Sequence, residues 1–121
     1  MLTFRDIPNS NVVEFTVDGH ITRDEFDAVR TVLDRKIADY GSVAVLEEIR
    51  DIGKIPPSVL WEDLKWVFRH LKQVSQAAVV CDADWVEKLV EVMRPLVTAE
   101  VRHFGLDEID EARDWLADTV D

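Results

Sequence analysis

Segments with the alternation of β-strands and segments with the periodicity of α-helices follow one another along almost the whole chain. Strands are expected at residues 2–7, 12–17, 43–49, 76–81 and 97–104. Helices are expected at residues 22–40, 58–72 and 84–94, and from residue 107 onward. Strands separated by helices favour right-handed crossovers and parallel pairing, whereas the first two strands are close enough for an antiparallel hairpin. The sequence therefore predicts an α/β fold with a five-stranded mixed, mainly parallel sheet flanked by four helices.

The second expected strand has two different faces. Val13, Phe15 and Val17 alternate with Glu14 and Thr16. Because side chains point to opposite faces of a strand in turn, this pattern predicts one buried face and one wet face. Residues 43–49 are more continuously apolar at their start, which predicts a strand nearer the centre of the sheet.

Capping residues mark the helix ends. Thr22 followed by Glu25 three residues later predicts a capping box, in which two otherwise unpaired backbone donors find acceptors. Gly41 is expected to end that helix. Asp84 and Glu87 have the same spacing and are expected to cap a later helix, which Pro95 closes.

Length and composition limit the class of protein. A chain of 121 residues with 47% hydrophobic and 32% charged residues has the balance of one soluble globular domain, spanning 1–121. A single Cys cannot form an internal disulfide, so a reducing, cytoplasmic setting is expected. No stretch approaches the ~20 apolar residues of a membrane span, and the first residues lack the pattern of a signal peptide.

Charge is unevenly distributed along the chain. The net charge of −11 disfavours nucleic acid as a partner, since phosphate binding needs a cationic surface. Residues 107–121 carry seven acids against one Arg, which is typical of a solvated helix face with acids favourable at its N-terminus. Residues 58–72 carry three cations against two acids. An anionic surface is therefore compatible with this one segment.

Residue patterns that would indicate catalysis are missing. The glycines are isolated, so no phosphate-binding Gly-rich loop is expected, and no serine has the flanking glycines of a nucleophile elbow. The three histidines have no spacing that would suggest zinc. Cys81 is interpreted as a small core residue and His103 as structural. Asp82 and Asp84 follow a strand, at the sheet edge where α/β proteins bind ligands, so a polar role stays open there. We expect no enzyme, metal or cofactor.

The segment 58–72 is the most informative helix. An apolar stripe runs along it and is flanked by Trp61 and Phe68, whereas Trp66 falls on the polar face. Ordinary packing against the sheet explains this pattern, and so does contact with a ligand, a partner or a membrane. The residues expected to bind an apolar or lipid-like ligand are Ile52, Ile55, Leu60, Trp61, Leu64 and Phe68. The residues expected to contact a membrane or partner are Lys65, Trp66 and Arg69.

Four groups of residues, in order along the chain, together resemble the SpoIIAA-like family. They are residues 14–22, residues 61–66 with His70, residues 78–82 with Trp85, and residues 100–104 with Ala112, Trp115 and Leu116. The resemblance implies similarity in fold to STAS domains, which include bacterial anti-sigma factor antagonists, and to the CRAL-TRIO lipid-transfer domain. It also implies a hydrophobic or lipid-like ligand and a second helix that is able to move and to meet the inner face of the membrane.

One feature of the anti-sigma factor antagonists is missing. Their phosphorylatable Asp-Ser-Ser-Gly type motif is replaced here by residues 55–60, in which Ser58 is the candidate phosphosite. A phosphate suits a helix N-terminus, and an ordinary N-cap explains Ser58 equally without one. The leading hypothesis is a non-enzymatic ligand-binding module. The alternative is a regulatory module that binds another protein without the usual phosphorylation switch. A homo-oligomer that buries Trp66 or an edge strand is a further expectation.

Overall fold

Five strands form one sheet in the computed structural model, which describes residues 1–19, 22–51, 73–96 and 99–118. The strands are β1 (Leu2–Asp6), β2 (Val12–Asp18), β3 (Val43–Asp51), β4 (Val74–Val80) and β5 (Glu100–Phe104). The described α-helices are α1 (Arg23–Tyr40), α3 (Asp84–Met93) and α4 (Ile109–Asp118). Two short 3₁₀ turns, η1 (Arg94–Leu96) and η2 (Leu106–Glu108), complete the described elements.

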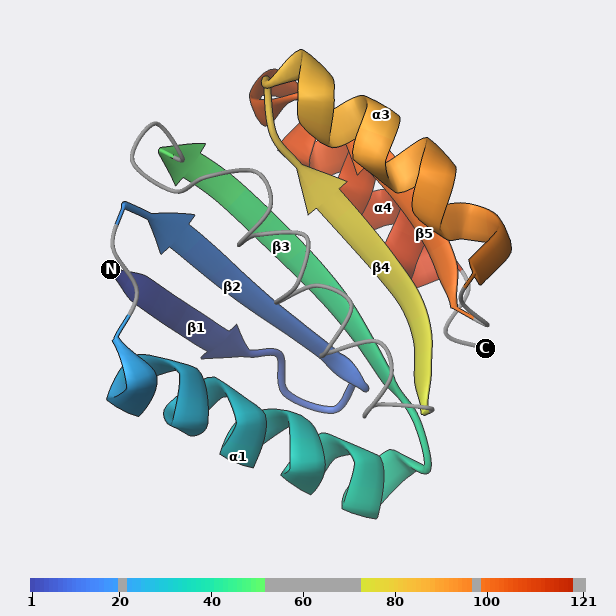
Figure 1. The fold of residues 1–121 in the computed structure, drawn as a ribbon. Coiled ribbons are helices and arrows are strands. Elements are labelled where there is room, and N and C mark those ends of the chain that lie inside the picture. The colour runs from blue at the N-terminus through green and yellow to red at the C-terminus, as the bar shows by residue number, and fades with distance from the viewer. Residues whose placement is uncertain (20–21, 52–72, 97–98, 119–121) are drawn as a thin grey trace.

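The strands lie in the sheet in the order in which they occur along the chain, from β1 to β5 (Figure 1). β1 pairs with β2 in antiparallel fashion, and the other three pairings are parallel. β3 is therefore the central strand, as its apolar sequence predicted, and the predicted mixed, mainly parallel sheet is confirmed. The structure describes three of the four expected helices, and the one predicted at 58–72 lies outside the described residues.

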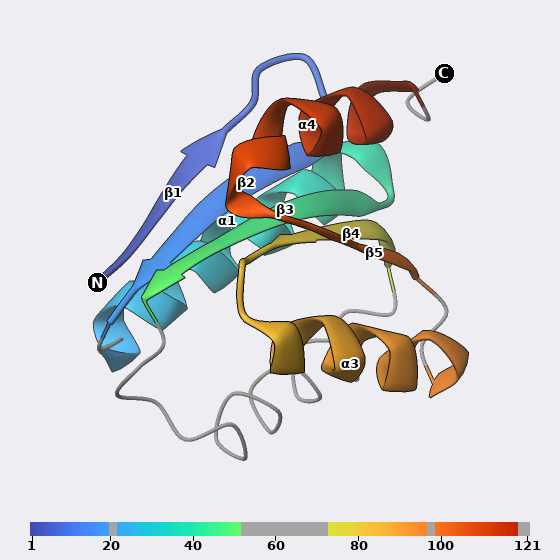
Figure 2. The ribbon, with the colours of Figure 1, turned by 90° about the horizontal axis from the view of Figure 1, so that it is seen from above.

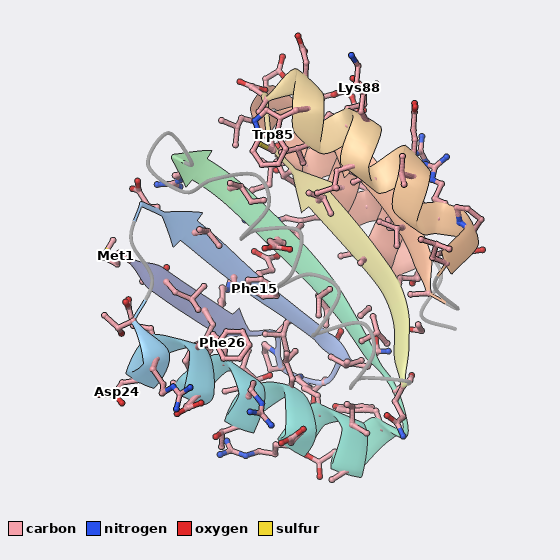
Figure 3. The ribbon with its side chains drawn as sticks, in the orientation of Figure 1. Met1, Phe15, Asp24, Phe26, Trp85 and Lys88 are labelled. Carbon is pink, nitrogen blue, oxygen red and sulfur yellow. The ribbon has the colours of Figure 1, made fainter. Side chains whose placement is uncertain are left out.

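Helices cover both faces of the sheet. α1 and α3 lie on one face and α4 lies on the other (Figure 2). Phe15 of β2 and Trp85 of α3 are partly buried against the core on the face of α1 and α3, while Lys88 points away from the sheet (Figure 3). The buried residues between α4 and the sheet form a smaller core: Val12, Ala44, Leu46, Ala78, Val80, Phe104, Ala112 and Leu116.

The capping box of α1 also ties the edge strand to this helix. The Thr22 hydroxyl accepts a hydrogen bond from the Glu25 N–H at 3.2 Å, and the Glu25 carboxylate accepts one from the Thr22 N–H at 3.0 Å. The second carboxylate oxygen of Glu25 accepts a hydrogen bond from the Leu2 N–H at 2.6 Å. Gly41 ends the helix with φ of 81°, a left-handed conformation that suits glycine. Both predicted ends of this helix are confirmed.

Glu25 should make part of the stability dependent on pH. The backbone N–H groups of Leu2 and Thr22 hold the pKa of Glu25 below its ordinary value of 4.5. A carboxyl group with a lowered pKa stabilises the folded state above its unfolded pKa, and this contribution is lost as the pH falls through the folded value. Glu25→Gln should therefore destabilise the protein at neutral pH, and the difference should shrink in acid. Urea unfolding of the wild type and of Glu25→Gln, from neutral pH into acid, measures this difference in stability. A difference that does not change with pH would contradict the lowered pKa of Glu25.

Two of the predicted helix starts need correction. Asp84 is the first residue of α3, and Ala83 occupies the N-cap without a side-chain hydrogen bond, so the predicted Asp84 cap was wrong. The helix begins one residue earlier than predicted, at Asp84, which lies in the first turn, where a carboxylate is favourable. The last helix was expected from residue 107, but a 3₁₀ turn occupies 106–108 and α4 begins at Ile109.

Candidate functional site

The carboxyl ends of β4 and β5 bring three of the singled-out residues together. The Nε2 atom of His103 lies 2.7 Å from the carbonyl oxygen of Cys81 and donates a hydrogen bond to it, since a carbonyl only accepts. The Asp82 carboxylate accepts a hydrogen bond from the Leu106 N–H at 2.8 Å. These contacts hold the two strand ends and the start of η2 in place. They agree with the structural interpretation of His103.

Cys81 is buried, with 2% of its surface exposed. Burial raises the pKa of its thiol, and the nearby carboxylates of Asp82 and Glu47 act in the same direction. Because the thiolate is the nucleophile, a raised pKa together with burial makes a thiol unreactive. The interpretation of Cys81 as a small core residue is therefore confirmed.

Alkylation tests this assignment directly. In the folded protein, Cys81 should react with iodoacetamide at least about tenfold more slowly than in urea-unfolded protein, because both access and thiolate formation are suppressed. The chain has a single Cys, so total incorporation measured by mass spectrometry reports this side chain alone. Equal rates in the folded and unfolded protein would show that the thiol is accessible and reactive.

The predicted ligand and membrane residues lie outside the described part of the chain. This applies to the whole set Ile52, Ile55, Ser58, Leu60, Trp61, Leu64, Lys65, Trp66, Phe68 and Arg69. Within the described residues, no group of three or more His, Cys, Asp and Glu side chains is arranged to hold a metal ion. Nor is any helix among them both long enough and apolar enough to cross a membrane.

A groove lies on the face of the sheet that carries α4. It has a volume of about 440 Å³. The residues around it come from β1, the β1–β2 turn, β2 and α4: Arg5, Ile7, Ser10, Val12, Glu14, Arg113, Leu116 and Ala117. A smaller hollow of about 210 Å³ shares Arg5, Glu14 and Arg113 and extends across the sheet to Glu48 and Arg50. The two hollows form one surface, which we call the α4 groove.

The position of α4 leaves this part of the sheet open. α4 packs on β3, β4 and β5, and β1 lies at the edge of the sheet that α4 does not cover (Figure 2). Ala44, Ala78 and Ala112 have no exposed surface, and such small side chains allow the helix to lie close to the sheet. The wet face predicted for β2 therefore faces the groove, where Glu14 and Thr16 are half-buried.

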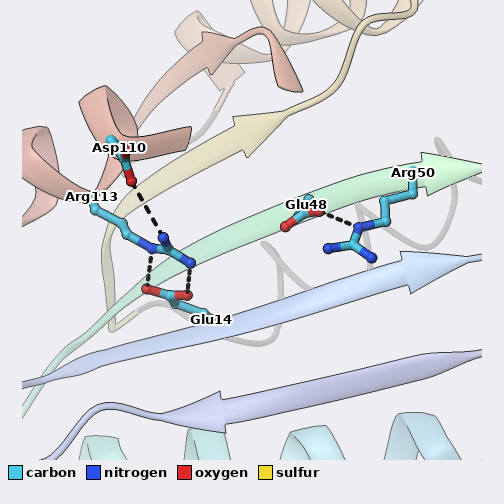
Figure 4. Close-up of polar contacts among 5 residues, drawn as sticks. All are labelled: Glu14, Glu48, Arg50, Asp110 and Arg113. Atoms are coloured by element: carbon cyan, nitrogen blue, oxygen red, sulfur yellow. Dashed lines mark hydrogen bonds and ion pairs between the residues drawn. The ribbon is translucent and has the colours of Figure 1, made fainter. Parts of the chain in front are cut away.

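Two ion pairs line the groove (Figure 4). The Arg113 guanidinium donates two hydrogen bonds of 3.0 Å to the two carboxylate oxygens of Glu14 and lies 3.5 Å from Asp110. The hydrogen bonds that Arg113 donates to Glu14 raise the pKa of Arg113 above its ordinary value. On β3, the strand next to β2, Arg50 pairs with Glu48 of the same strand. Both glutamates are thus neutralised by arginines at the edge of the groove.

Arg5 differs from the other two arginines. It lies directly opposite Glu14 in the antiparallel register of β1 and β2. Its side chain is exposed, and among the described residues it has no hydrogen-bond or ion-pair partner, whereas Arg113 binds both oxygens of Glu14. The groove therefore has one available guanidinium beside an apolar floor.

Sequence reasoning missed this site. Its one signal was the polar face of β2, and Arg113 stood out only as the single cation of an acidic C-terminal segment. Glu14 and Arg113 are 99 positions apart, so only the packing of α4 on the sheet brings them together.

Comparison with known proteins agrees with the observed architecture. The family model described as SpoIIAA-like matches residues 12–117. A similar solved structure is the crystal structure of an uncharacterized protein of the DUF3478 family with a SpoIIAA-like fold, from Shewanella loihica PV-4. It has 18% identity and a TM-score of 0.67, over 96% of this chain and 92% of that one. No curated protein matches. The sheet order and the family match together lead to one conclusion: this chain belongs to the SpoIIAA-like family.

Proposed function

We propose that this chain is a non-enzymatic SpoIIAA-like module that binds a small hydrophobic or lipid-like molecule. The observation that supports it is the α4 groove, whose larger hollow has a volume of about 440 Å³, within the range of small-molecule sites. Ile7, Val12 and Leu116 supply apolar surface, and the charged side chains stand around them. This combination suits a ligand with an apolar body and a polar end.

The state of the reactive side chains supports a binding role. Cys81 is buried with a raised pKa, and His103 is committed to a backbone carbonyl. A nucleophile needs an activating base within hydrogen-bond reach, and these two groups are instead used for structure.

Purification without detergent tests ligand binding. Native mass spectrometry of such protein, followed by lipid extraction, should identify a bound small molecule, and titration with 1-decanol should show saturable binding. Ala117→Trp should reduce the binding of 1-decanol, because Ala117 is an exposed residue at the groove and a larger side chain would fill it. The absence of both a co-purifying molecule and saturable binding would overturn the proposal.

The proposal extends to residues 52–69 on the strength of their sequence. Apolar ligand contacts are proposed for Ile52, Ile55, Leu60, Trp61, Leu64 and Phe68. Leu64→Gln is the matched test of this set. If it abolishes ligand binding while Ala117→Trp leaves binding intact, the ligand is held by this segment and not by the α4 groove.

Peripheral contact with the inner face of the membrane is proposed for Lys65, Trp66 and Arg69, since residues 58–72 are slightly cationic in an acidic chain. Vesicles of phosphatidylglycerol should shift the tryptophan fluorescence, and vesicles of phosphatidylcholine should not. Trp66→Leu should remove the shift. A signal that is identical for both lipids, or absent, would contradict the membrane proposal.

A second candidate function is regulation through another protein, as in STAS-type antagonists. The observation that favours it is β1, an edge strand whose outer side has no neighbouring strand in the described sheet. Met1 and Phe4 are exposed beside this edge, with 59% and 43% of their surfaces accessible. Such an edge can accept a strand from a partner or from a second copy of the chain.

Two measurements address this candidate. Sedimentation over a range of concentrations should detect self-association, and Phe4→Lys should reduce it if the β1 edge is the interface. A pull-down that recovers a regulatory kinase or a sigma-related protein, lost on Ser58→Glu, would favour a phosphorylation-controlled module. Recovery that is unaffected by Ser58→Glu would count against control at this serine.

A further inference from the structure

The α4 groove has a built-in preference for one kind of polar end. We infer that it selects amphipathic monocarboxylates: Arg5 binds the carboxylate, and the apolar residues beside it bind the hydrocarbon. This inference rests on the proposed function and names the ligand class of the same site. It follows from which arginines are available, from the charges around the groove and from the position of the apolar floor.

The availability of the three arginines differs. Arg113 is held by both oxygens of Glu14 and lies close to Asp110. Arg50 is held by Glu48. Arg5 has no such partner among the described residues, although it stands opposite Glu14 across the β1–β2 pair. A guanidinium with free donors binds a planar carboxylate through two parallel hydrogen bonds.

The charges around the groove favour a single negative charge on the ligand. Three arginines and two glutamates line the two hollows, so the lining side chains have an excess of one positive charge in a chain of net charge −11; Asp110, beside Arg113, lies outside the lining. A monocarboxylate balances that excess. A dianionic phosphate would bring a second negative charge close to Glu14 and Glu48 without a second free cation. Like charges that are close together repel, so this second charge would weaken binding.

The apolar part of the groove begins next to Arg5. Ile7 follows Arg5 by two positions and lines the same hollow, together with Val12, Leu116 and Ala117. A chain or ring attached to a carboxylate at Arg5 can therefore lie along these side chains and lose contact with water. Burial of apolar surface supplies most of the affinity, and Arg5 supplies the discrimination between polar ends.

Two ligands with the same hydrocarbon and different ends test the inference. Calorimetric titration of the full chain with decanoate and with 1-decanol, both below their aggregation limits, should show decanoate binding about fivefold to tenfold more tightly. Arg5→Gln should lower the affinity for decanoate to that for 1-decanol and leave 1-decanol unchanged. Arg35→Gln is the matched control, because Arg35 is an exposed arginine on α1 at the opposite face of the sheet, and it should change neither affinity.

Failure of the inference and failure of the proposed function give different results. Equal affinity of the wild type for both ligands, or an Arg5→Gln protein that still prefers decanoate, overturns the carboxylate preference and leaves ligand binding intact. Binding of neither ligand overturns ligand binding in the groove, and the carboxylate preference with it. Tighter binding of decyl phosphate than of decanoate would overturn the preference for a single charge.

Glu14→Gln provides an independent gain-of-function test. Removing the charge of this carboxylate weakens the hold on the Arg113 guanidinium, whose other ion-pair partner is Asp110 at 3.5 Å, and removes the nearest repulsive charge. Decanoate should bind about fivefold more tightly to this variant, and the relative disadvantage of decyl phosphate should shrink. Urea unfolding confirms that the variant is folded at the titration temperature. Unchanged or weaker decanoate binding to the folded variant would contradict the charge arrangement on which the inference depends.

Discussion

Replacing Lys36 with Met should lower the free energy of unfolding by about 3 kcal/mol. Lys36 belongs to α1, yet only 7% of its side chain is exposed. Its ammonium group donates hydrogen bonds to the carbonyl oxygens of Ile7, at 2.7 Å, and Ser10, and pairs with the Asp6 carboxylate at 2.6 Å. One side chain thus closes the turn between β1 and β2 and attaches that turn to the helix.

The size of the effect follows from what the substitution leaves behind. Met fills most of the volume of Lys but donates no hydrogen bond, so two carbonyl groups lose a partner in a sheltered site. An unpaired buried acceptor costs about 1–3 kcal/mol, and breaking a buried ion pair costs about 3–5 kcal/mol. Asp6 is 44% exposed and regains water, so the expected loss is about 3 kcal/mol, the lower end of the range for a buried ion pair.

Urea unfolding followed by circular dichroism measures this loss. Arg35→Met, one residue earlier, removes a cation from an exposed position of the same helix and should change stability by less than about 0.5 kcal/mol. If the two variants are equally stable, Lys36 is not a structural cation, and the assignment of its three contacts is wrong.

Leu116→Ala should also cost about 3 kcal/mol, because large-to-small changes at buried leucines cost about 2–5 kcal/mol. Leu116 is 1% exposed and belongs to the core between α4 and the sheet. α4 has 10 residues, and only Ala112 and Leu116 are fully buried among its described side chains. A large part of the attachment of the helix thus depends on this one residue.

The ion pair of α4 should matter much less than its apolar anchor. Arg113 pairs with Glu14, but its side chain is 43% exposed, and exposed pairs contribute about 0–1 kcal/mol. Arg113→Ala should therefore cost about 1 kcal/mol or less. Asp114→Ala, at an exposed position of the same helix, should be nearly neutral. Urea unfolding of Leu116→Ala, Arg113→Ala and Asp114→Ala ranks their losses of stability. A loss for Arg113→Ala as large as that for Leu116→Ala would show that the ion pair holds the helix.

The parts of the fold that depend on neighbouring residues were predictable. The alternation in β2 and the capping box of Thr22 and Glu25 involve contacts within a few positions, and both were confirmed. Asp84 and Glu87 have the same local pattern, and here the prediction was wrong. Whether an Asp is the N-cap or the first helical residue depends on how the chain leaves β4, and the Cys81 N–H is held by the Phe104 carbonyl on β5.

Neither the burial of Lys36 nor the α4 groove could be predicted from neighbouring residues, because both depend on contacts between segments that are far apart in the chain. Lys36 has the appearance of a surface lysine on an amphipathic helix, and its burial is decided by the β1–β2 turn that covers it. Arg5 has the appearance of any edge-strand cation. In the described part of the structure it has no ion-pair partner, and Glu14 opposite it is bound by Arg113 of α4.

The sequence by itself determined the order of strands and helices, their apolar faces and the caps of α1, because these follow from hydrophobic periodicity and from hydrogen bonds between residues three or four positions apart. Only the tertiary structure decided which charges are neutralised and which guanidinium is left with free donors. Those facts depend on distances between segments such as β2 and α4, and such distances are set by the packing of Ala44, Ala78 and Ala112 between helix and sheet.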